Sequence, residues 1–392
     1  MRALRFDRKP LRYAAAFVAG SLSPGKGAAV GPLALVDDDP PALPSPDWVT
    51  IRPRLAGICG SDLSTVDGTS SRYFEPIVSF PFVPGHEVVA DAPDGARVVV
   101  EPVLGCVTRA INPPCPACAR GDLGNCERLA YGVLEPGLQT GFCCDTGGGW
   151  STAMVAHPSQ LHRVPDAMSD EAAVMVEPTA CAVHAALAAG VHEGDTVVVL
   201  GSGTLGLLTI AALRHFTPAG AIIAAARYPE QKRWARTFGA TTVCDPPELA
   251  RTVRRATGSL AYREQLTGGA DAVVDCVGSE GSITESLAIV KPRGQITLVG
   301  MPAGVKLNLT TLWHRETRLV GAYAYGTETL ASGERRRTFE LAFELVAAAG
   351  LERLVSATYP LRDYKAALEH AATAGRRGAV KVCFDLRSEK GR

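Results

Sequence analysis

Alternating apolar and polar positions dominate the first 175 residues or so. The pattern recurs in Met1–Phe6, Trp48–Leu55 and Ala96–Glu101, with glycine and proline clusters between these segments. Period-two alternation over such short segments is typical of β-strands with one buried face. The proline-rich stretch 39–46 interrupts the pattern and indicates a surface connection. We therefore expect this part of the chain to be all-β.

The pattern changes near Ser169, where helical segments and continuous apolar runs begin to alternate. A helix is expected over 170–190, and the apolar run Thr196–Leu200 is typical of a strand buried on both faces. Further helices are expected over 205–215, 230–238 and 282–290, and further strands over 221–225, 272–275 and 295–299. This alternation predicts a parallel, doubly wound sheet.

Beyond about Leu319 the pattern is mixed again. A helix is expected over 336–348 and a last strand over 378–384. We infer that this segment returns to the first domain. Residues 1–178 and 320–392 would then form a β domain and residues 179–319 an α/β domain, as suits a chain of 392 residues.

Composition and charge exclude several classes of protein. The 40 basic and 40 acidic residues balance, and no block of like charge suggests a nucleic-acid or membrane surface. No apolar run approaches a membrane span, and the apolar stretch Tyr13–Gly20 is too short for a signal peptide. An odd count of 11 clustered cysteines argues against a secreted disulfide scaffold. We expect a cytoplasmic protein.

A glycine fingerprint, Gly201, Gly203 and Gly206, follows the first strand of the α/β region and opens a helix. Glycines at such a turn permit the tight bend, the approach of a pyrophosphate and close helix–strand packing, and the helix N-terminus attracts phosphate charge. In this context the motif predicts a dinucleotide site rather than a plain turn.

The end of the second strand of that region bears on which nucleotide is bound. Sites that prefer NAD place an acid there to hold the ribose hydroxyls, but here Ala226 occupies the place and Arg227 follows. An absent carboxylate removes repulsion of a 2′-phosphate, and an arginine offers it two donors. We therefore predict NADP(H) over NAD(H). The alternative is a solvated Arg227 and a protein that accepts both nucleotides.

Three short motifs upstream of the glycine fingerprint carry metal-ligating residues. They contain Cys59, the pair His86 and Glu87, and Glu177. Thiolate, imidazole and carboxylate are the ligands that zinc takes in catalytic sites, where another position stays open for water or substrate. A metal site followed by a nucleotide site in one chain indicates metal-assisted hydride transfer.

A second group of cysteines comprises Cys106, Cys115, Cys118 and Cys126. Four thiolates that close a tetrahedral site would hold a structural zinc ion. The spacing leaves three alternatives: a four-cysteine site, three cysteines with another ligand, or an empty lobe. We expect the four-cysteine site.

Together these motifs resemble the zinc-dependent alcohol dehydrogenases of the medium-chain dehydrogenase/reductase superfamily, especially the polyol, threonine and glucose dehydrogenase branch. The matching stretches are 57–62, 84–87, the cysteine group, 176–178 and 201–206, all in the family's order. The resemblance implies an α/β fold with a GroES-like β catalytic domain and a doubly wound Rossmann domain. It also implies a zinc-dependent oxidoreductase that transfers a hydride between an alcohol or polyol, or the matching carbonyl compound, and NADP(H).

By position, the resemblance makes Cys59 and His86 ligands of a catalytic Zn²⁺ ion. Glu177 stands where the family has its third protein ligand. Alternatively Glu87 ligates the metal directly and Glu177 acts through water, and the sequence leaves both arrangements open. The cysteine group, by the family pattern, begins three residues before Cys115, where this chain has Asn112, so Cys106 would have to be brought round by the intervening loop.

Further residues match the family's catalytic positions. Asp62 would orient His86, as metal-bound histidines require, and Lys381 would be the basic partner of the glutamate beside the metal. Ser61 would hydrogen-bond the substrate oxygen and start the proton relay, whose next position is Ser64 here and a histidine in some relatives. The alternative is that Ser61 only caps a turn.

For the nucleotide, the resemblance implies contacts from Gly201, Gly203, Thr204, Leu205, Gly206, Ala226, Arg227 and Val277. Family members commonly assemble through edge strands of the Rossmann sheet, so we expect a homodimer or homotetramer. Compared with the family, the segment 13–35 is long and the segment 88–98 is short. Two rival hypotheses are a zinc-free NADPH-dependent double-bond reductase, disfavoured by Cys59, His86 and Glu177, and a nucleotide-binding structural or regulatory protein without turnover.

Overall fold

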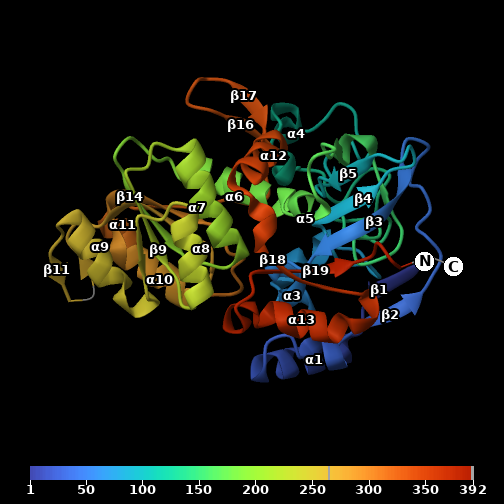
Figure 1. Cartoon of the computed structure of the whole chain (residues 1–392), viewed down its shortest axis with the longest axis horizontal. Coiled ribbons are helices and arrows are strands. Elements are labelled where there is room, and N and C mark those ends of the chain that lie inside the picture. The colour runs from blue at the N-terminus through green and yellow to red at the C-terminus, as the bar shows by residue number, and fades with distance from the viewer. Residues whose placement is uncertain (264, 390–392) are drawn as a thin grey trace. The chain divides into compact units, whose positions relative to one another are not determined.

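The computed structural model describes residues 1–263 and 265–389, which form two compact units (Figure 1). The first unit combines Met1–Glu177 with the C-terminal segment that begins at Gly350, and the second comprises Pro178–Ala349. One unit is rich in antiparallel strands and the other contains a parallel sheet. The predicted α/β fold class with two kinds of domain is confirmed.

The first unit is built on a seven-stranded sheet in the order β18-β19-β3-β4-β5-β7, with β6 paired to β3. Its strands are β3 (Val49–Gly57), β4 (Val88–Asp91), β5 (Arg97–Val100), β6 (Met154–Ala156), β7 (Leu161–Arg163), β18 (Val355–Tyr359) and β19 (Lys381–Asp385). The C-terminal strand β19 runs antiparallel to β3, with Cys383 opposite Gly57. The chain therefore returns to its first unit, as predicted.

Short helices and turns surround this sheet. They are α3 (Gly60–Val66), η1 (Arg72–Ile77), α4 (Pro116–Arg120), η2 (Leu123–Asn125), η3 (Pro158–Gln160), α5 (Asp170–Ala173), η5 (Leu351–Leu354), η6 (Leu361–Asp363), α13 (Tyr364–Ala372) and η7 (Ala374–Arg377). Helix α6 (Val176–Ala188) begins in the first unit and continues in the second.

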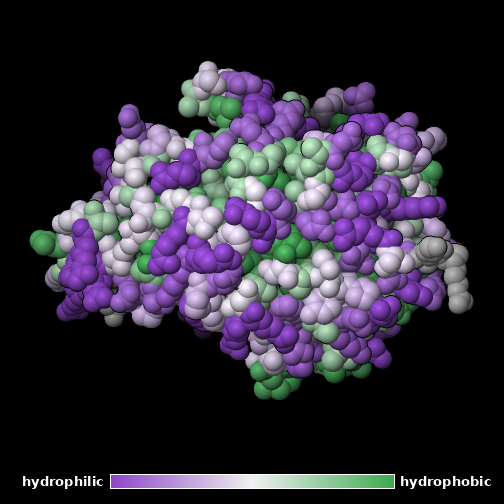
Figure 2. Space-filling model, in the orientation of Figure 1, coloured by the Kyte–Doolittle hydropathy of each residue, from purple (hydrophilic) through white to green (hydrophobic). Residues whose placement is uncertain are grey.

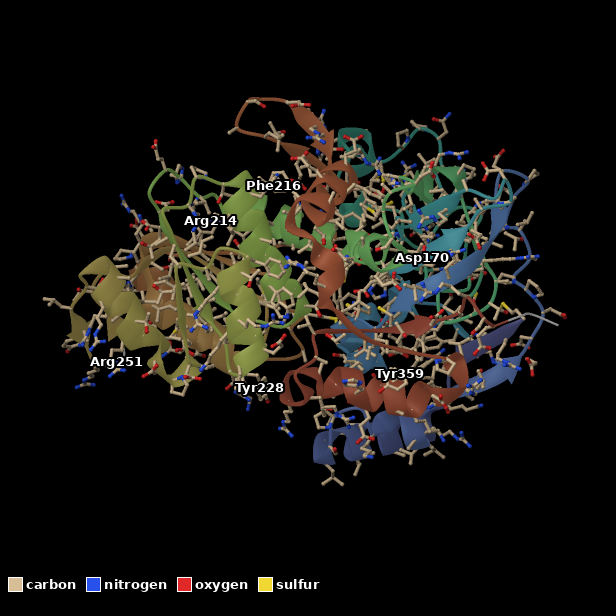
Figure 3. All side chains as sticks on the ribbon, viewed as in Figure 1. Asp170, Arg214, Phe216, Tyr228, Arg251 and Tyr359 are labelled. Carbon is tan, nitrogen blue, oxygen red and sulfur yellow. The ribbon has the colours of Figure 1, made fainter. Side chains whose placement is uncertain are left out.

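The buried carboxylate of Asp170, at the start of α5, ties distant strands together (Figure 3). It accepts hydrogen bonds from Arg54 of β3 and Arg97 of β5, each at 3.0 Å, and lies 3.5 Å from Arg387 after β19. These charge-assisted contacts hold β3, β5 and the segment after β19 against the start of α5.

The long segment near the N-terminus forms two helices that the sequence analysis did not predict. Helices α1 (Pro10–Leu22) and α2 (Gly27–Val30) lie between the paired strands β1 (Arg2–Phe6) and β2 (Leu33–Asp37). Figure 2 shows apolar surface over α1, where Leu11 and Leu22 are exposed. The buried carboxylate of Asp67, just after α3, accepts hydrogen bonds from the N–H of Gly25, between α1 and α2, at 2.8 Å and from the N–H of Gly27, at the start of α2, at 2.9 Å.

The second unit contains six parallel strands in the order β10-β9-β8-β13-β14-β15. They are β8 (Thr196–Leu200), β9 (Ala221–Ala225), β10 (Thr242–Cys244), β13 (Ala270–Asp275), β14 (Val290–Leu298) and β15 (Arg318–Gly321). The chain leaves β8 toward one edge and returns to β13 on its other side. The carboxyl ends of β8 and β13 therefore flank the switch point at which doubly wound sheets bind ligands.

Helices and two hairpins complete the second unit. The helices are α7 (Thr204–Phe216), α8 (Pro229–Thr237), η4 (Pro246–Glu248), α9 (Leu249–Thr257), α10 (Glu280–Ile289), α11 (Thr310–His314) and α12 (Thr338–Ala349). The hairpins pair β11 (Ala261–Tyr262) with β12 (Gln265–Leu266) and β16 (Thr327–Thr329) with β17 (Arg335–Arg337). Figure 1 shows the β16–β17 hairpin extending away from α12.

Two predictions about the organisation of the chain are wrong. Residues 320–349 group with the second unit, because Glu344 of α12 binds His215 of α7 (3.1 Å) and Glu328 of β16 binds His184 of α6 (2.8 Å). The single helix expected over 170–190 is two helices, α5 and α6. Pro178 cannot donate a hydrogen bond to the carbonyl four residues earlier, and α5 ends next to that position.

None of the helices in the described part of the chain combines the length and apolar character that crossing a membrane requires.

Candidate active site

Three metal-ligating side chains from the sequence motifs meet in the first unit. Cys59, His86 and Glu87 each offer a ligand atom, and these atoms all lie within 4.8 Å of one another. We call this group the mixed-donor cluster. Cys59 precedes α3 at the end of β3, and the other two residues precede β4. Because β3 and β4 are antiparallel neighbours, and the Gly57 N–H donates to the Glu87 carbonyl at 2.8 Å, the sheet itself brings the three side chains together.

Asp62, in the first turn of α3, contacts two members of this cluster, Cys59 and His86. Its Oδ2 accepts a hydrogen bond from the Cys59 N–H at 3.0 Å, and its Oδ1 faces Nδ1 of His86 at 3.5 Å. Burial alone would lower the pKa of the His86 imidazole, but Asp62 and the Cys59 thiol raise that pKa well above its ordinary value. Nδ1 is thus oriented by a carboxylate, which leaves the other ring nitrogen available as a ligand.

Lys381 of β19 forms a buried ion pair with Glu87. Its ammonium group also donates to the Ile58 carbonyl at 3.3 Å. Burial alone would lower the pKa of Lys381, but the nearby Glu87 and Cys59 raise it. The pair needs the glycine at position 57, because a Cβ atom there would lie 1.8 Å from Oε2 of Glu87.

The mixed-donor cluster fits a zinc ion. Sulfur, nitrogen and oxygen donors are those of catalytic zinc sites. The buried atoms Oδ1 of Asp62 and Nδ1 of His86 face each other without completing a hydrogen bond. A carboxylate in that place is the arrangement that orients metal-bound histidines.

The other two candidate catalytic residues, Glu177 and Ser61, lie outside this group of ligand atoms. Glu177 is buried in the first turn of α6 and, among the described residues, is not part of the group of mutually close ligand atoms. Ser61 is a half-buried residue of α3, and its carbonyl accepts a hydrogen bond from Thr65 at 2.9 Å. The choice between Glu87 and Glu177 as metal ligand, and the relay role of Ser61, stay predictions.

The four cysteines of the second group also meet. Ligand atoms of Cys106, Cys115, Cys118 and Cys126 all lie within 4.8 Å of one another, and we call this group the cysteine lobe. Cys106 belongs to it although nine positions separate it from Cys115. The intervening loop folds back so that the Cys115 N–H donates to the Cys106 sulfur at 3.3 Å. Four sulfur atoms this close together provide the donor set that a closed tetrathiolate site requires.

Backbone N–H groups surround the sulfur atoms of this lobe. Cys118 N–H and Glu127 N–H donate to Cys115 at 3.4 and 3.5 Å, and Arg128 N–H donates to Cys126 at 3.4 Å. Burial raises the pKa of Cys115, but the two N–H groups together with hydrogen bonds to the Cys118 and Cys106 thiols outweigh it and lower that pKa to about 6. Burial raises the pKa of Cys126 to about 11. The lobe therefore contains one readily ionised thiol held by oriented amides.

The predicted nucleotide fingerprint lies at the switch point of the parallel sheet in the second unit. Gly201 has φ of +86°, and a Cβ atom at Gly206 would lie 1.7 Å from the Gly201 carbonyl oxygen. Gly203 is exposed and begins α7, with open space where a side chain would be. Thr204 and Leu205 form the first turn of α7, and Val277 follows β13 beside Gly201.

The end of β9 carries the residues that bear on nucleotide choice. Ala226 is buried and its N–H donates to the Cys244 carbonyl at 3.0 Å, whereas Arg227 is exposed. Tyr228, labelled in Figure 3, precedes α8. Lys232 is engaged with Asp245 at 2.8 Å, but the Arg227 guanidinium forms no ion pair with any described residue. Arg227 is therefore free to meet an anion.

The sequence analysis missed residues that contact the mixed-donor cluster from the loop 141–150. The Phe142 ring lies 5.9 Å from that of His86, and the Trp150 indole donates to the Gly57 carbonyl at 3.2 Å. The sequence held no signal for these particular contacts, because they join segments far apart in the chain.

Comparisons with known proteins agree with this architecture. Residues 45–166 match the family described as "Alcohol dehydrogenase GroES-like domain", and residues 204–357 match the one described as "Zinc-binding dehydrogenase". The chain is 30% identical over 342 residues to "Probable D-xylulose reductase A" of Arthroderma otae, covering 84% of this chain and 88% of that one. It is 28% identical over 315 residues to "Sorbitol dehydrogenase" of Bacillus subtilis, covering 74% and 82% of the two chains.

The fold is also found among solved structures. Galactitol-1-phosphate dehydrogenase from Escherichia coli superimposes with a TM-score of 0.70 at 20% identity, over 98% of this chain and 100% of the other. At this level of identity the likeness shows a shared fold.

Proposed function

Because this chain belongs to the zinc-dependent alcohol and polyol dehydrogenases of the medium-chain dehydrogenase/reductase superfamily, we propose that the mixed-donor cluster is its catalytic zinc site and that its nicotinamide cofactor is NADP(H). The chain is an enzyme that oxidises alcohols or polyols, or reduces the matching carbonyl compounds. The observation that carries the proposal is the convergence of Cys59, His86 and Glu87 beside the carboxylate of Asp62.

Cys59 and His86 would hold the ion, with Glu87 or Glu177 as the third protein ligand. When bound, zinc polarises the substrate oxygen and makes loss of its proton and of the hydride feasible. Asp62 fixes the His86 ring, and Lys381 neutralises the buried charge of Glu87. Ser61 would accept the hydroxyl proton of the substrate while passing its own hydroxyl proton on along the relay, whose next position is Ser64. The cysteine lobe would hold a second, structural zinc ion, since four thiolates leave no open position.

Production of reduced nicotinamide by the zinc-loaded protein tests this function. The names of the relatives suggest sorbitol and the reduction of D-xylulose as the first substrates, followed by other polyols, sugars, amino alcohols and simple secondary alcohols. We expect turnover with a hydroxylated substrate that is lost on chelation and restored by zinc. Turnover that survives complete zinc removal would favour the zinc-free reductase chemistry, and none in either direction would overturn the proposal.

The preference for NADP(H) rests on the free guanidinium of Arg227 and the absent carboxylate at Ala226. A 2′-phosphate there would gain charge-assisted hydrogen bonds without repulsion. Arg227→Asp should therefore lower kcat/KM for NADP by about a hundred-fold relative to NAD, since hydrogen bonds to a charged group contribute about 1.5–3 kcal/mol. Arg233→Asp, nearby on α8, is the matched control. An unchanged ratio in Arg227→Asp would refute the assignment.

We further propose that the protein is a homo-oligomer that pairs through β15. This strand is hydrogen-bonded only to β14 in its sheet, and exposed edges are ready to pair with another chain. Leu309 and Trp313 before it and Tyr323 after it are exposed apolar residues. Size-exclusion chromatography with light scattering should show a dimer or tetramer, and a monomer at micromolar concentration would contradict this.

A further inference from the structure

Arg109 lies inside the loop that separates Cys106 from Cys115, and its side chain is completely buried. Within the described part of the chain, its guanidinium donates to backbone carbonyls alone. These are the carbonyls of Leu104, Tyr131 and Leu134 at 3.1 Å, Glu135 at 3.3 Å and Gly137 at 2.7 Å. One side chain thus joins the residues before the cysteine lobe to the segment 131–137 that follows it.

The positive charge of Arg109 has no carboxylate partner. Among the described residues it forms no ion pair, although a buried charge is costly without a counter-charge. Burial lowers the pKa of Arg109, and the groups that act in the opposite direction are, in decreasing order, the Cys143 thiol, the Cys126 thiol, Asp145 and the Cys106 thiol. Two of these three thiols belong to the cysteine lobe.

We propose that Arg109 is the counter-charge of a metal-loaded cysteine lobe and a positioning residue for it. The inference rests on the proposed metal binding by the lobe. Four thiolates around one divalent cation carry two net negative charges. The Arg109 guanidinium is held by five carbonyls of the segments that flank these thiolates, and its positive charge offsets part of theirs. Binding of the metal in turn removes the cost of burying Arg109, so the two are coupled.

The contacts of Arg109 are linked to the mixed-donor cluster through Glu135 and the loop that contains Cys143. The Glu135 carbonyl that Arg109 contacts also accepts a hydrogen bond from the Cys143 thiol at 3.6 Å. Cys143 adjoins Phe142, whose ring lies against His86. Loading of the lobe would therefore order segment 131–137 and support the wall beside the catalytic residues.

Chelator competition on the holoenzyme tests the role of Arg109. Both metal sites are loaded with Co²⁺, and the loss of the thiolate-to-cobalt absorption of the lobe is followed against increasing chelator. In Arg109→Met we expect the lobe to bind cobalt at least about ten-fold more weakly, as for other residues that support metal ligands. Arg109→Lys keeps the charge but not the planar guanidinium group. The cobalt affinity of its lobe should therefore lie between those of the wild type and Arg109→Met.

Arg128→Met is the matched control, because Arg128 is in the same lobe but its side chain donates only to the Pro113 carbonyl, at 3.0 Å. It should bind cobalt as the wild type does. Hydrogen exchange gives a second readout: metal removal should expose the Val133 N–H, which donates to the Arg109 carbonyl at 3.1 Å.

The outcomes separate this inference from the function on which it rests. A wild-type protein that binds no metal at the lobe overturns both the metal assignment and the role of Arg109. Normal lobe affinity in Arg109→Met overturns only the role of Arg109, as does an equal loss at both metal sites. Should Arg109→Met fail to fold, the lysine variant decides: weakened lobe binding supports the proposal, and unchanged binding overturns it.

Discussion

The mixed-donor cluster and the cysteine lobe lie in the same unit but are held by different kinds of partner. Charged side chains surround the first: Asp62 faces His86, and Lys381 is paired with Glu87. Backbone N–H groups surround the second, and the buried Arg109 in its loop is itself held by carbonyls. Charged side-chain partners balance the charge of the first group, whereas oriented amides hold the sulfur atoms of the second in place and favour the ionised form of Cys115. A site for chemistry and a site for folding are therefore distinguishable by their neighbours.

The largest expected effect comes from removing a ligand of the mixed-donor cluster. His86→Ala should lower turnover by at least about a thousand-fold, because polarisation of the substrate oxygen contributes several kcal/mol. Zinc content should fall by one ion per chain while the lobe keeps its own. The control is Cys144→Ser, a half-buried thiol outside both groups. Near-normal turnover in His86→Ala would contradict the assignment of the mixed-donor cluster as the catalytic site.

The charged surroundings of the cluster can be tested through stability. Lys381→Met leaves Glu87 as an unpaired buried charge, so the free energy of unfolding of the zinc-free protein should fall by about 3–5 kcal/mol. Lys26→Met removes an exposed pair with Glu369 and should cost about 1 kcal/mol or less. Urea denaturation measures both. Equal losses in the two variants would show that the buried pair has no special role.

Removing one cysteine of the lobe should have the smallest effect on turnover. Cys106→Ser should reduce zinc from two ions to one per chain and lower the thermal midpoint, because structural zinc contributes directly to folding. Turnover of the folded protein should fall only several-fold, since the open site remains intact. Cys244→Ser, a buried cysteine of the second unit, is the control. Two zinc ions retained in Cys106→Ser would exclude this residue as a ligand.

Local patterns in the sequence predicted most of the fold. Strands β8 and β9 begin and end where the apolar runs do, because a strand buried on both faces needs an unbroken run. Helix α1 was not predicted, since its apolar residues are largely exposed and its surroundings suggested strands. The boundary near residue 320 was misplaced because α12 is held to α7 by side chains distant in sequence, such as His215 and Glu344.

For the candidate sites too, residues in local motifs could be predicted, whereas contacts between distant segments could not. Cys59, His86 and the fingerprint glycines lie in local motifs, so the sequence could identify them. Arg109 could not be found, because an arginine in a loop is ordinarily solvated and nothing nearby in sequence indicates that distant carbonyls enclose it. The long-range partners of a site, rather than its ligands, required the structure.

Anomalous scattering at the zinc absorption edge, from crystals of the zinc-loaded protein with NADP, tests the account most directly. We predict two peaks per chain, one between Cys59, His86 and either Glu87 or Glu177, and one enclosed by Cys106, Cys115, Cys118 and Cys126. No peak at Cys59 and His86, or a lobe peak that Cys106 does not contact, would contradict the contrast between an open mixed-donor site and a closed tetrathiolate site.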